Sequence, residues 1–395
     1  MPDRLPEHAA ALWTSSRGER LLAAAREVRT LEALRRPAAL ASLGSREDVR
    51  LALMQDGWRQ RAAGKVPHAE RLLFTGEALE QASAWPVALE RAGRLGLAAG
   101  ACVADLCAGI GLDALAAATH GLRVVAVERD ATRARLLAWN ARALGLDARV
   151  EVRCADVEQD APEADAAFLD PDRRAGGTRT RDAAQFAPAL GAWDALLSRY
   201  GRALVKVAPG GPSPAPERAS EVVTLEGEAR ERRLLWRGFE HAPHRCAVAL
   251  PGGQRVAGHG IAWPAAREPK AGDWLLDPDP SLTLAGVVGE ACVSHGLAPI
   301  HPRIACLLGT RPQPALAGTW LEVLEVLAPS RPALQDWVRT HGIGRLEVRC
   351  RGVADDAEAW RRRLRLGGPA AGALLFTRGP DDRWLALATR RAPSA

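Results

Sequence analysis

The spacing of apolar residues changes along the chain and divides it into regions. In residues 1–95, apolar side chains recur every three or four positions, as in Leu21, Leu22, Ala25 and Val28. That spacing places them on one face of a helix. Proline and glycine residues interrupt the pattern at short intervals. The sequence therefore predicts an N-terminal region built from short helices.

After residue 95, short apolar runs alternate with amphipathic segments. We predict strands and intervening helices, the strands at 101–106, 123–127, 149–153, 166–169 and 203–207, and the helices from about 112, at 131–144 and at 183–197. Such alternation is typical of a doubly wound, largely parallel sheet. Three closer runs are expected to be antiparallel edge strands, at 221–225, 233–236 and 245–250. We therefore expect a Rossmann-like α/β domain over residues 96–266.

The remaining residues are expected to form a connection and a small separate domain. Pro, Gly and Asp are frequent between 264 and 280, so residues 267–328 are predicted to be a linker and connecting segment, with one helix at 282–295. Beyond it the pattern predicts a helix, a strand, a helix and two strands, at 332–340, 345–349, 357–364, 373–377 and 384–388. This gives a small α+β domain over residues 329–395.

A glycine turn follows the first predicted strand. The strand ends at Asp105, Gly109 and Gly111 form the turn, and Asp113 opens the next helix. Glycine permits positive φ and a close approach of ligand to backbone. The third glycine of G-x-G-x-x-G is missing, and an acidic residue would repel a pyrophosphate. The turn therefore favours a cationic ligand with a free amine.

Acidic residues also end the next two strands. Glu128 follows the second strand, where a carboxylate can accept both hydroxyls of a ribose. Asp156 follows the third strand, placed to accept from an adenine amino group. Either residue alone could be a solvated side chain at a strand end. Together with Asp105, they predict a nucleoside ligand at one edge of the sheet.

The fourth and fifth strands end in residues suited to an acceptor substrate. Asp170 can orient or deprotonate a nucleophile, and Pro171 fixes the backbone beside it. Two arginines follow that can hold a phosphate, although a plain charged turn is the alternative: Arg173 and Arg174. Lys206, at the end of the fifth strand, is expected to pair with Asp170 or Asp172 or to contact substrate. A purely structural ion pair is equally compatible.

The order of these motifs resembles the class I methyltransferases. Within them, the chain is similar to a bacterial family with a THUMP-like C-terminal domain, through segments 73–83, 105–113, 170–177, 205–210 and 345–352. The resemblance implies S-adenosyl-L-methionine as cofactor, held by the strand-end residues and the glycine turn: Asp105, Gly109, Gly111, Asp113, Glu128 and Asp156. It also implies that Thr75 and Gln81 close over the site.

The acceptor is less well defined by the motifs. The turn Asp-Pro-Asp-Arg at 170–173 is similar to the Asp-Pro-Pro-aromatic motif of amine methyltransferases and to the Asp-Pro-Pro-Arg turn of uridine-carbon methyltransferases. It lacks the aromatic that would stack on a flipped base, and no cysteine stands where a uridine adduct needs one. We expect a base nitrogen of structured RNA. Protein or small-molecule methylation, or an RNA-binding protein that retains the fold without chemistry, are the alternatives.

Charge and cysteine content refine the expected partners. The net charge of +6 leans towards polyanions. The C-terminal domain carries seven arginines that suggest RNA binding, although acidic residues interrupt them and a solvated helix face is the alternative: Arg345, Arg349, Arg351, Arg361, Arg362, Arg363 and Arg365. Seven cysteines without a C-x-x-C pair, and no apolar run near the ~20 residues of a membrane helix, predict a cytoplasmic protein. We expect no metal site, and the oligomeric state stays open.

Overall fold

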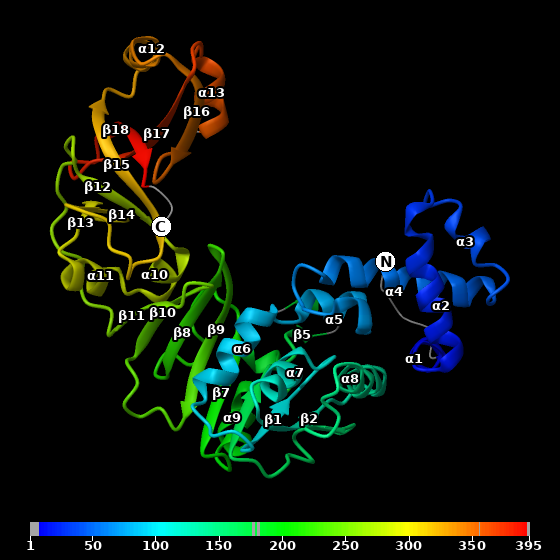
Figure 1. Ribbon diagram of the computed structural model, residues 1–395. Coiled ribbons are helices and arrows are strands. Elements are labelled where there is room, and N and C mark those ends of the chain that lie inside the picture. The colour runs from blue at the N-terminus through cyan, green and yellow to red at the C-terminus, as the bar shows by residue number, and fades with distance from the viewer. Residues whose placement is uncertain (1–7, 176–177, 180–181, 355, 393–395) are drawn as a thin grey trace. The chain divides into compact units, whose positions relative to one another are not determined.

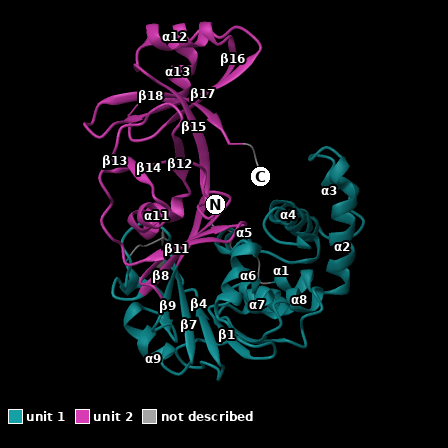
Figure 2. Cartoon of the chain, turned by 60° about the vertical axis from the view of Figure 1, so that its left-hand side comes forward, with its two compact units in different colours: residues 1–218, 233–241 teal, residues 219–232, 242–395 magenta. Residues whose placement is uncertain are grey.

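The computed structural model describes residues 8–175, 178–179, 182–354 and 356–392. The chain divides into two compact units, residues 1–218 with 233–241, and residues 219–232 with 242–395 (Figure 2). Among the helices of the described residues, none combines the length and the apolar character needed to cross a membrane.

The N-terminal region of the first unit is helical, as predicted. Its α-helices are α1 (His8–Trp13), α2 (Ser16–Glu27), α3 (Arg36–Ala39), α4 (Arg46–Ala62), α5 (Gly76–Gln81) and α6 (Trp85–Arg94) (Figure 1). Helix α4 begins with a capping box, in which Ser45 and Asp48 each accept the other's backbone N–H at 3.1 Å. The rings of Trp13 and Trp58 form a T-shaped pair, with ring centroids 5.9 Å apart. Local caps and one apolar face therefore stabilise these short helices together.

Five parallel strands form the centre of the first unit. They are β1 (Cys102–Leu106), β2 (Arg123–Val127), β3 (Val150–Arg153), β4 (Ala166–Leu169) and β7 (Arg202–Val207), in the order β7-β4-β1-β2-β3. Helices α7 (Leu112–Thr119) and α8 (Ala131–Ala143) connect the first three strands. The doubly wound prediction is confirmed. The strand order changes direction between β1 and β4, and ligands of open α/β sheets bind at the carboxyl ends of strands at such a point.

The sheet continues through β9 (Glu228–Arg237), β8 (Ala219–Leu225), β10 (Arg245–Leu250) and β11 (Gln254–Gly258) to nine strands. Strand β10 pairs antiparallel with β11 but parallel with β8. The prediction of an antiparallel edge is therefore wrong for the β8–β10 pair. Strand β9 lies between the two in sequence and carries the chain back, so that β10 enters the sheet in the direction of β8. Apolar spacing within each strand contains no information on that direction.

The predicted helix at 183–197 is broken into shorter elements. The structure has two 3₁₀ turns, η3 (Ala183–Gln185) and η4 (Leu190–Ala192), before α9 (Trp193–Leu197). Pro188 lies between them, and proline cannot donate the backbone hydrogen bond that a continuous helix requires. A small hairpin of β5 (Arg174–Ala175) and β6 (Thr178–Arg179) precedes them.

The second unit contains a seven-stranded sheet in the order β13-β14-β12-β15-β18-β17-β16. Its strands are β12 (Trp274–Pro278), β13 (Ala298–His301), β14 (Ile304–Gly309), β15 (Gly318–Leu327), β16 (Ile343–Cys350), β17 (Ala370–Arg378) and β18 (Trp384–Arg391), and its helices are α10 (Pro280–Ala285), α11 (Val288–His295), α12 (Arg331–Thr340) and α13 (Ala357–Arg363). Residues 267–328, expected as a linker, thus supply four strands of this sheet. β12 was not predicted because its buried apolar run is short and lies among the Pro, Gly and Asp residues around 264–280.

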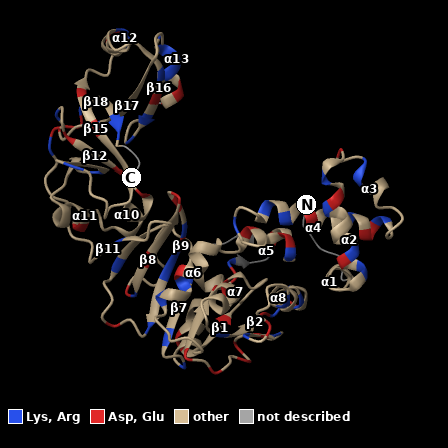
Figure 3. Cartoon of the chain, in the orientation of Figure 1, with Lys and Arg blue, Asp and Glu red and all other residues tan. Residues whose placement is uncertain are grey.

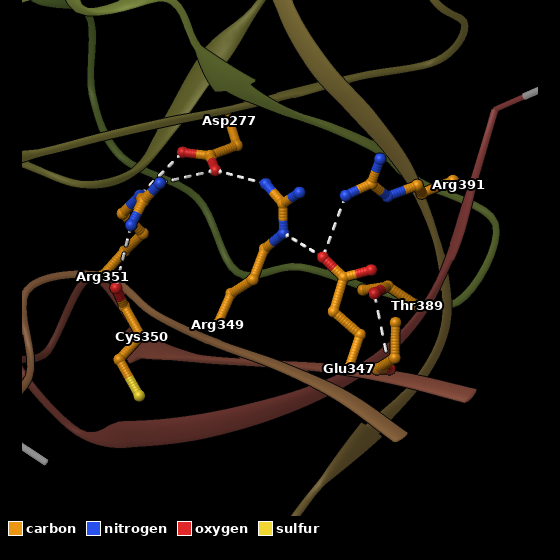
Figure 4. Close-up of polar contacts among 8 residues, drawn as sticks. Asp277, Glu347, Arg349, Cys350, Arg351, Thr389 and Arg391 are labelled. Atoms are coloured by element: carbon orange, nitrogen blue, oxygen red, sulfur yellow. Dashed lines mark hydrogen bonds and ion pairs between the residues drawn. The ribbon is translucent and has the colours of Figure 1, made fainter. Parts of the chain in front are cut away.

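Charged side chains of separate strands of this sheet make ion pairs, although three strands lie between β12 and β16 in the sheet order. Asp277 of β12 is buried and accepts from Arg349 Nη1 at 2.9 Å and from Arg351 Nε at 2.8 Å, both on β16 (Figure 4). Glu347 accepts from Arg349 Nε and from Arg391 Nη2, each at 2.9 Å. Two of the arginines that the sequence assigns to RNA binding are therefore paired inside the unit.

Asn140, the single asparagine of the chain, connects the N-terminal region to the sheet. It is fully buried on α8, accepts the N–H of Leu73 at 2.7 Å, and donates to the carbonyls of Leu73 at 3.0 Å and Ile110 at 3.2 Å. Gln55 of α4 pairs with the backbone of Phe74 in the same two-bond manner, at 2.9 and 3.0 Å. These contacts hold the extended segment before α5 against the glycine turn.

We expect Asn140→Leu to lower the free energy of unfolding of the chain by about 3 kcal/mol, because it leaves buried N–H and C=O groups of Leu73 without partners. Urea unfolding of both proteins measures the difference. Arg142→Ala, at an exposed position of the same helix, is the control and should change stability by less than about 0.5 kcal/mol. A loss below about 1 kcal/mol for Asn140→Leu would show that the clamp is dispensable.

Candidate active site

The turn after β1 has the backbone conformation that its glycines were expected to provide. Gly109 and Gly111 have φ values of 60° and 87°, and Cys107, not a glycine, has φ of 67°. A Cβ on Gly111 would lie 2.5 Å from Cγ of Leu137, so packing against α8 excludes any side chain there. A Cβ on Gly109 would meet no atom within 4 Å. The turn is therefore closed on its α8 side and open at Gly109.

Asp105 lies one residue before the carboxyl end of β1 and is almost completely buried, at 2% exposure. Within the described residues, its Oδ2 atom has no hydrogen-bond partner. Burial raises the pKa of Asp105 to about 8, the charge of Asp113 adds to the shift, and Arg91 opposes it. A buried carboxyl without a partner is costly unless a donor or a positive charge reaches it. This environment fits a ligand that brings an ammonium group.

Asp113, at the start of α7, is held by two residues of the N-terminal region. Its Oδ1 lies 2.7 Å from Nη1 of Arg91, and its Oδ2 accepts from the Ser83 hydroxyl at 3.1 Å. Arg91 Nη2 also donates to Ser83 Oγ at 3.0 Å. Arg91 and Ser83 are both buried, and the sequence reasoning missed both. The available signal was an arginine on the otherwise apolar face of α6 formed by Val87, Ala88 and Ala92.

Glu128 contacts the glycine turn directly. Its Oε2 accepts the N–H of Gly109 at 2.7 Å, its Oε1 accepts the N–H of Asp130 at 2.8 Å, and its side chain is buried. Asp156 is half-buried and accepts the N–H of Glu158 at 3.0 Å, which closes a local turn after β3. The structure thus joins Glu128 to the turn and keeps Asp156 at the end of the third strand.

Asp170 and Lys206 form an ion pair at the ends of β4 and β7. Lys206 Nζ lies 2.5 Å from Asp170 Oδ2 and also donates to Ser83 Oγ at 3.2 Å. Of the two partners expected for Lys206, Asp170 is the one found, whereas Asp172 lies 3.5 Å from Nη2 of Arg129. The Asp170 side chain is 30% exposed, and no hydrogen bond to its Oδ1 occurs in the described part of the chain. Its neighbour Pro171 is buried.

The other candidate residues lie outside this network. Thr75 caps α5 by accepting the N–H of Ala78 at 3.0 Å, and Gln81 is exposed and donates to Glu77 at 3.4 Å. Arg173 is half-buried. Arg174 belongs to β5, but its side chain is outside the described part of the structure.

The thiol of Cys107 and the grouping of potential metal ligands are two other features that could supply chemistry at this site. The surrounding protein raises the pKa of the Cys107 thiol well above its ordinary value, chiefly by excluding water, so the thiol stays protonated. Its Sγ donates to the carbonyl of Ala187 at 3.9 Å. Wherever side chains are described, no three His, Cys, Asp or Glu residues are grouped so that they could hold a metal ion.

Comparison with known proteins agrees with this architecture. Residues 318–390 match the model of the THUMP domain-like family. A solved structure from Porphyromonas gingivalis W83, provisionally described as a methyltransferase, superimposes with a TM-score of 0.74 at 18% identity. The superposition covers 95% of this chain and 99% of that chain. At this identity the likeness shows the fold alone.

Sequence relatives identify the enzyme class. Two strains of Mycobacterium tuberculosis each contain a protein named an uncharacterized S-adenosylmethionine-dependent methyltransferase, which is 37% identical to this chain over 334 residues. The alignment covers 81% of this chain and 90% of each relative. The cofactor of this chain is S-adenosylmethionine, as the resemblance to the class I methyltransferases implied. The chain belongs to the S-adenosylmethionine-dependent methyltransferases, and it has a THUMP-like domain at its C-terminus.

Proposed function

We propose that this methyltransferase modifies a nitrogen atom of a base in structured RNA. The observation that carries the RNA assignment is the THUMP domain-like match at residues 318–390, since such a module implies RNA binding. The net charge of +6 agrees with a polyanionic substrate.

In this proposal the strand-end carboxylates hold the cofactor. Asp105 accepts from the amine of the methionine part, because its buried Oδ2 needs a charged donor. Glu128 accepts from the ribose hydroxyls, and Asp156 from the adenine amino group. The open side of Gly109 gives the ligand access to the backbone. When bound, S-adenosylmethionine supplies a methyl group made electrophilic by the positive sulfur.

Asp170 and Pro171 hold the acceptor amine. Lys206 fixes Oδ2 of Asp170 at 2.5 Å, so Oδ1 is the atom that accepts an N–H of the base. The carbonyl of Pro171 accepts a second N–H, and together they direct the nitrogen lone pair. Methyl transfer leaves one excess proton on the nitrogen, and Asp170 Oδ1 takes it. The contribution of the enzyme is chiefly alignment of nucleophile, methyl carbon and sulfur.

Helix α13 is basic (Figure 3), and we assign the phosphate contacts of the substrate to it. Arg361 and Arg362 are exposed, and their acidic neighbours Glu358 and Asp356 are 3.9 and 3.8 Å away. Exposed pairs of this kind are worth little, so a phosphate can replace them. Arg349 and Arg351 are less suited, because both guanidinium groups are already held by the carboxylate of Asp277.

Cofactor binding is expected to release a proton at about pH 7. The carboxyl of Asp105, with a pKa of about 8, is mostly protonated there in the free protein. An ammonium placed beside it favours the carboxylate and lowers that pKa. The affinity for the cofactor should therefore rise as the pH increases towards about 8. Above that pH, the titration of Asp105 should no longer change the affinity.

Calorimetry of S-adenosylmethionine binding measures the number of protons released, when it is repeated in two buffers that differ in ionisation enthalpy. Asp105→Asn should bind more weakly and release none, and nicotinamide dinucleotides should not bind the parent protein. Equal proton release by the parent and by Asp105→Asn would exclude Asp105 as the group that receives the amine.

Asp170→Asn is expected to lower methyl transfer by about 100-fold or more while cofactor affinity stays within about twofold, because it removes the acceptor of the proton. Tritium transfer from labelled cofactor into total RNA, compared with total protein, measures activity and substrate class together. Asp172→Asn is the matched control, since Asp172 lies two residues on and pairs with Arg129. Label in protein alone would contradict the RNA assignment, and full activity of Asp170→Asn would contradict the role of Asp170.

Reversal of charge at Arg361 and Arg362 of α13 should weaken RNA binding and reduce the slope of log K against log salt by about 1 to 2, because each phosphate contact releases counterions. Filter binding over a salt series measures the slope. The control changes Arg20 and Arg26 of α2 to Glu, an equal change of charge on exposed positions. Equal losses in both double variants would mean that net charge, and not α13, determines the affinity.

A further inference from the structure

The hydroxyl of Ser83 has every hydrogen-bonding position occupied. A serine hydroxyl has one hydrogen to donate and two lone pairs to accept. Ser83 Oγ donates to Asp113 Oδ2 at 3.1 Å and accepts from Arg91 Nη2 at 3.0 Å and Lys206 Nζ at 3.2 Å. Because Ser83 is buried, at 7% exposure, water does not compete for these bonds. The direction of the Ser83 O–H bond is therefore fixed towards Asp113.

The backbone around Ser83 is fixed as well. The N–H of Trp85 donates to the carbonyl of Lys65 at 3.0 Å, and Lys65 Nζ donates to the carbonyl of Leu79 at 2.7 Å. The segment between α5 and α6 is thus tied to the chain that precedes it on both sides of Ser83. Because this segment is held in place, the Ser83 hydroxyl is a fixed hydrogen-bond acceptor for the ammonium of Lys206.

The side chain of Lys206 is long and flexible, so a fixed acceptor is required to hold its ammonium in one position. Its side chain is only 10% exposed, and its ammonium lies between Ser83 Oγ and Asp170 Oδ2. Loss of the Ser83 contact removes one restraint that keeps the ammonium on Oδ2, and the ammonium can then shift towards Oδ1, the oxygen assigned to the acceptor amine. Displacements of about 1 Å at a reacting centre can cost about 100-fold in rate.

We infer that Ser83 is a positioning residue for methyl transfer, which holds Lys206 Nζ on one oxygen of Asp170 and connects it through Asp113 to the cofactor turn. Ser83 touches neither methyl group nor acceptor in this assignment and acts through Lys206. Its consequence for turnover rests on the proposed role of Asp170, whereas its consequence for Lys206 does not. The two are therefore measured separately.

The first measurement observes Lys206 directly. The chain has three lysines, Lys65, Lys206 and Lys270, so ¹⁵N-lysine labelling gives few Nζ signals in NMR, and Lys206→Arg identifies the signal to be followed. In the parent protein the Lys206 NH₃⁺ hydrogens should exchange slowly with water. In Ser83→Ala we expect exchange about tenfold faster, from loss of one charge-assisted hydrogen bond. Ser83→Thr should restore slow exchange, with the Lys270 signal unchanged throughout.

The second measurement follows tritium transfer into RNA. Ser83→Ala should lower kcat by about 10- to 100-fold with KM for S-adenosylmethionine within about threefold, and Ser83→Thr should recover most of the rate. Ser198→Ala removes the same atom from a hydroxyl that donates to the carbonyl of Ala195 at 3.1 Å, and should match the parent. Cofactor binding and thermal unfolding report on folding. If Ser83→Ala does not fold, Ser83→Cys, which keeps the volume with a weak donor, takes its place.

The outcomes separate this inference from the proposed function. The inference would be overturned if Lys206 exchanges in Ser83→Ala, or in the substitute Ser83→Cys, as slowly as in the parent. It would also be overturned if Ser83→Thr disturbs Lys206 as much as Ser83→Ala does, since packing and not the hydroxyl would then matter. Faster exchange with unchanged kcat would also overturn it, because Lys206 would not need to be held. If the parent transfers no methyl to RNA, the proposed function fails, while the exchange data still decide whether Ser83 holds Lys206.

Discussion

The buried ion pair between Arg91 and Asp113 is the interaction on which the site depends. A guanidinium that is 3% exposed must have an anion beside it, because the cost of burying an unpaired charge is several kcal/mol. Asp113 at the start of α7 provides that anion, so α6 has to pack where Arg91 reaches it. This fixes Ser83, at the entrance to α6, between Asp113 and Lys206. The helical N-terminal region is therefore a structural part of the candidate active site.

Asp105 differs from these residues because, in the part of the chain that the structure describes, its carboxyl group takes part in no ion pair. Its neighbours Asp113, Asp170 and Lys206 are engaged in ion pairs, whereas its Oδ2 has no hydrogen bond within the described residues. An unpaired buried carboxyl lowers the stability of the fold, and such costs persist where a ligand offsets them. The raised pKa of Asp105 and the polar network beside it are two results of one arrangement, since the carboxylates that Arg91 and Lys206 hold in place also add to that pKa.

Much of the sheet could be predicted because parallel strands are short apolar runs with abrupt ends. Glu128 and Asp170 follow such runs directly, Asp105 lies one residue before the end of its run, and Asp156 lies three residues after its run, so their common edge could be inferred from the sequence alone. Contacts between distant segments could not. Ser83 and Lys206 are 123 positions apart, and no local pattern marks a serine that will meet a lysine. The parallel β8–β10 pair and β12 escaped prediction for the same reason, because strand direction and sheet membership depend on what the rest of the chain does.

The arginines of the C-terminal unit show how far composition can mislead. From the sequence alone, the two arginines of β16, Arg349 and Arg351, suggest polyanion binding as strongly as Arg361 and Arg362 do. Asp277, more than 70 positions earlier, distinguishes the first pair, because the fold places its buried carboxylate against both guanidinium groups. Removing either arginine would leave that carboxylate partly uncompensated, so those arginines are needed for folding before they can serve a ligand. Arg361 and Arg362 carry no such obligation, since their acidic partners are exposed and at the distance limit of an ion pair. Arg361 and Arg362 of α13 are therefore more accessible to a polyanion than Arg349 and Arg351, although the sequence alone does not distinguish the two pairs.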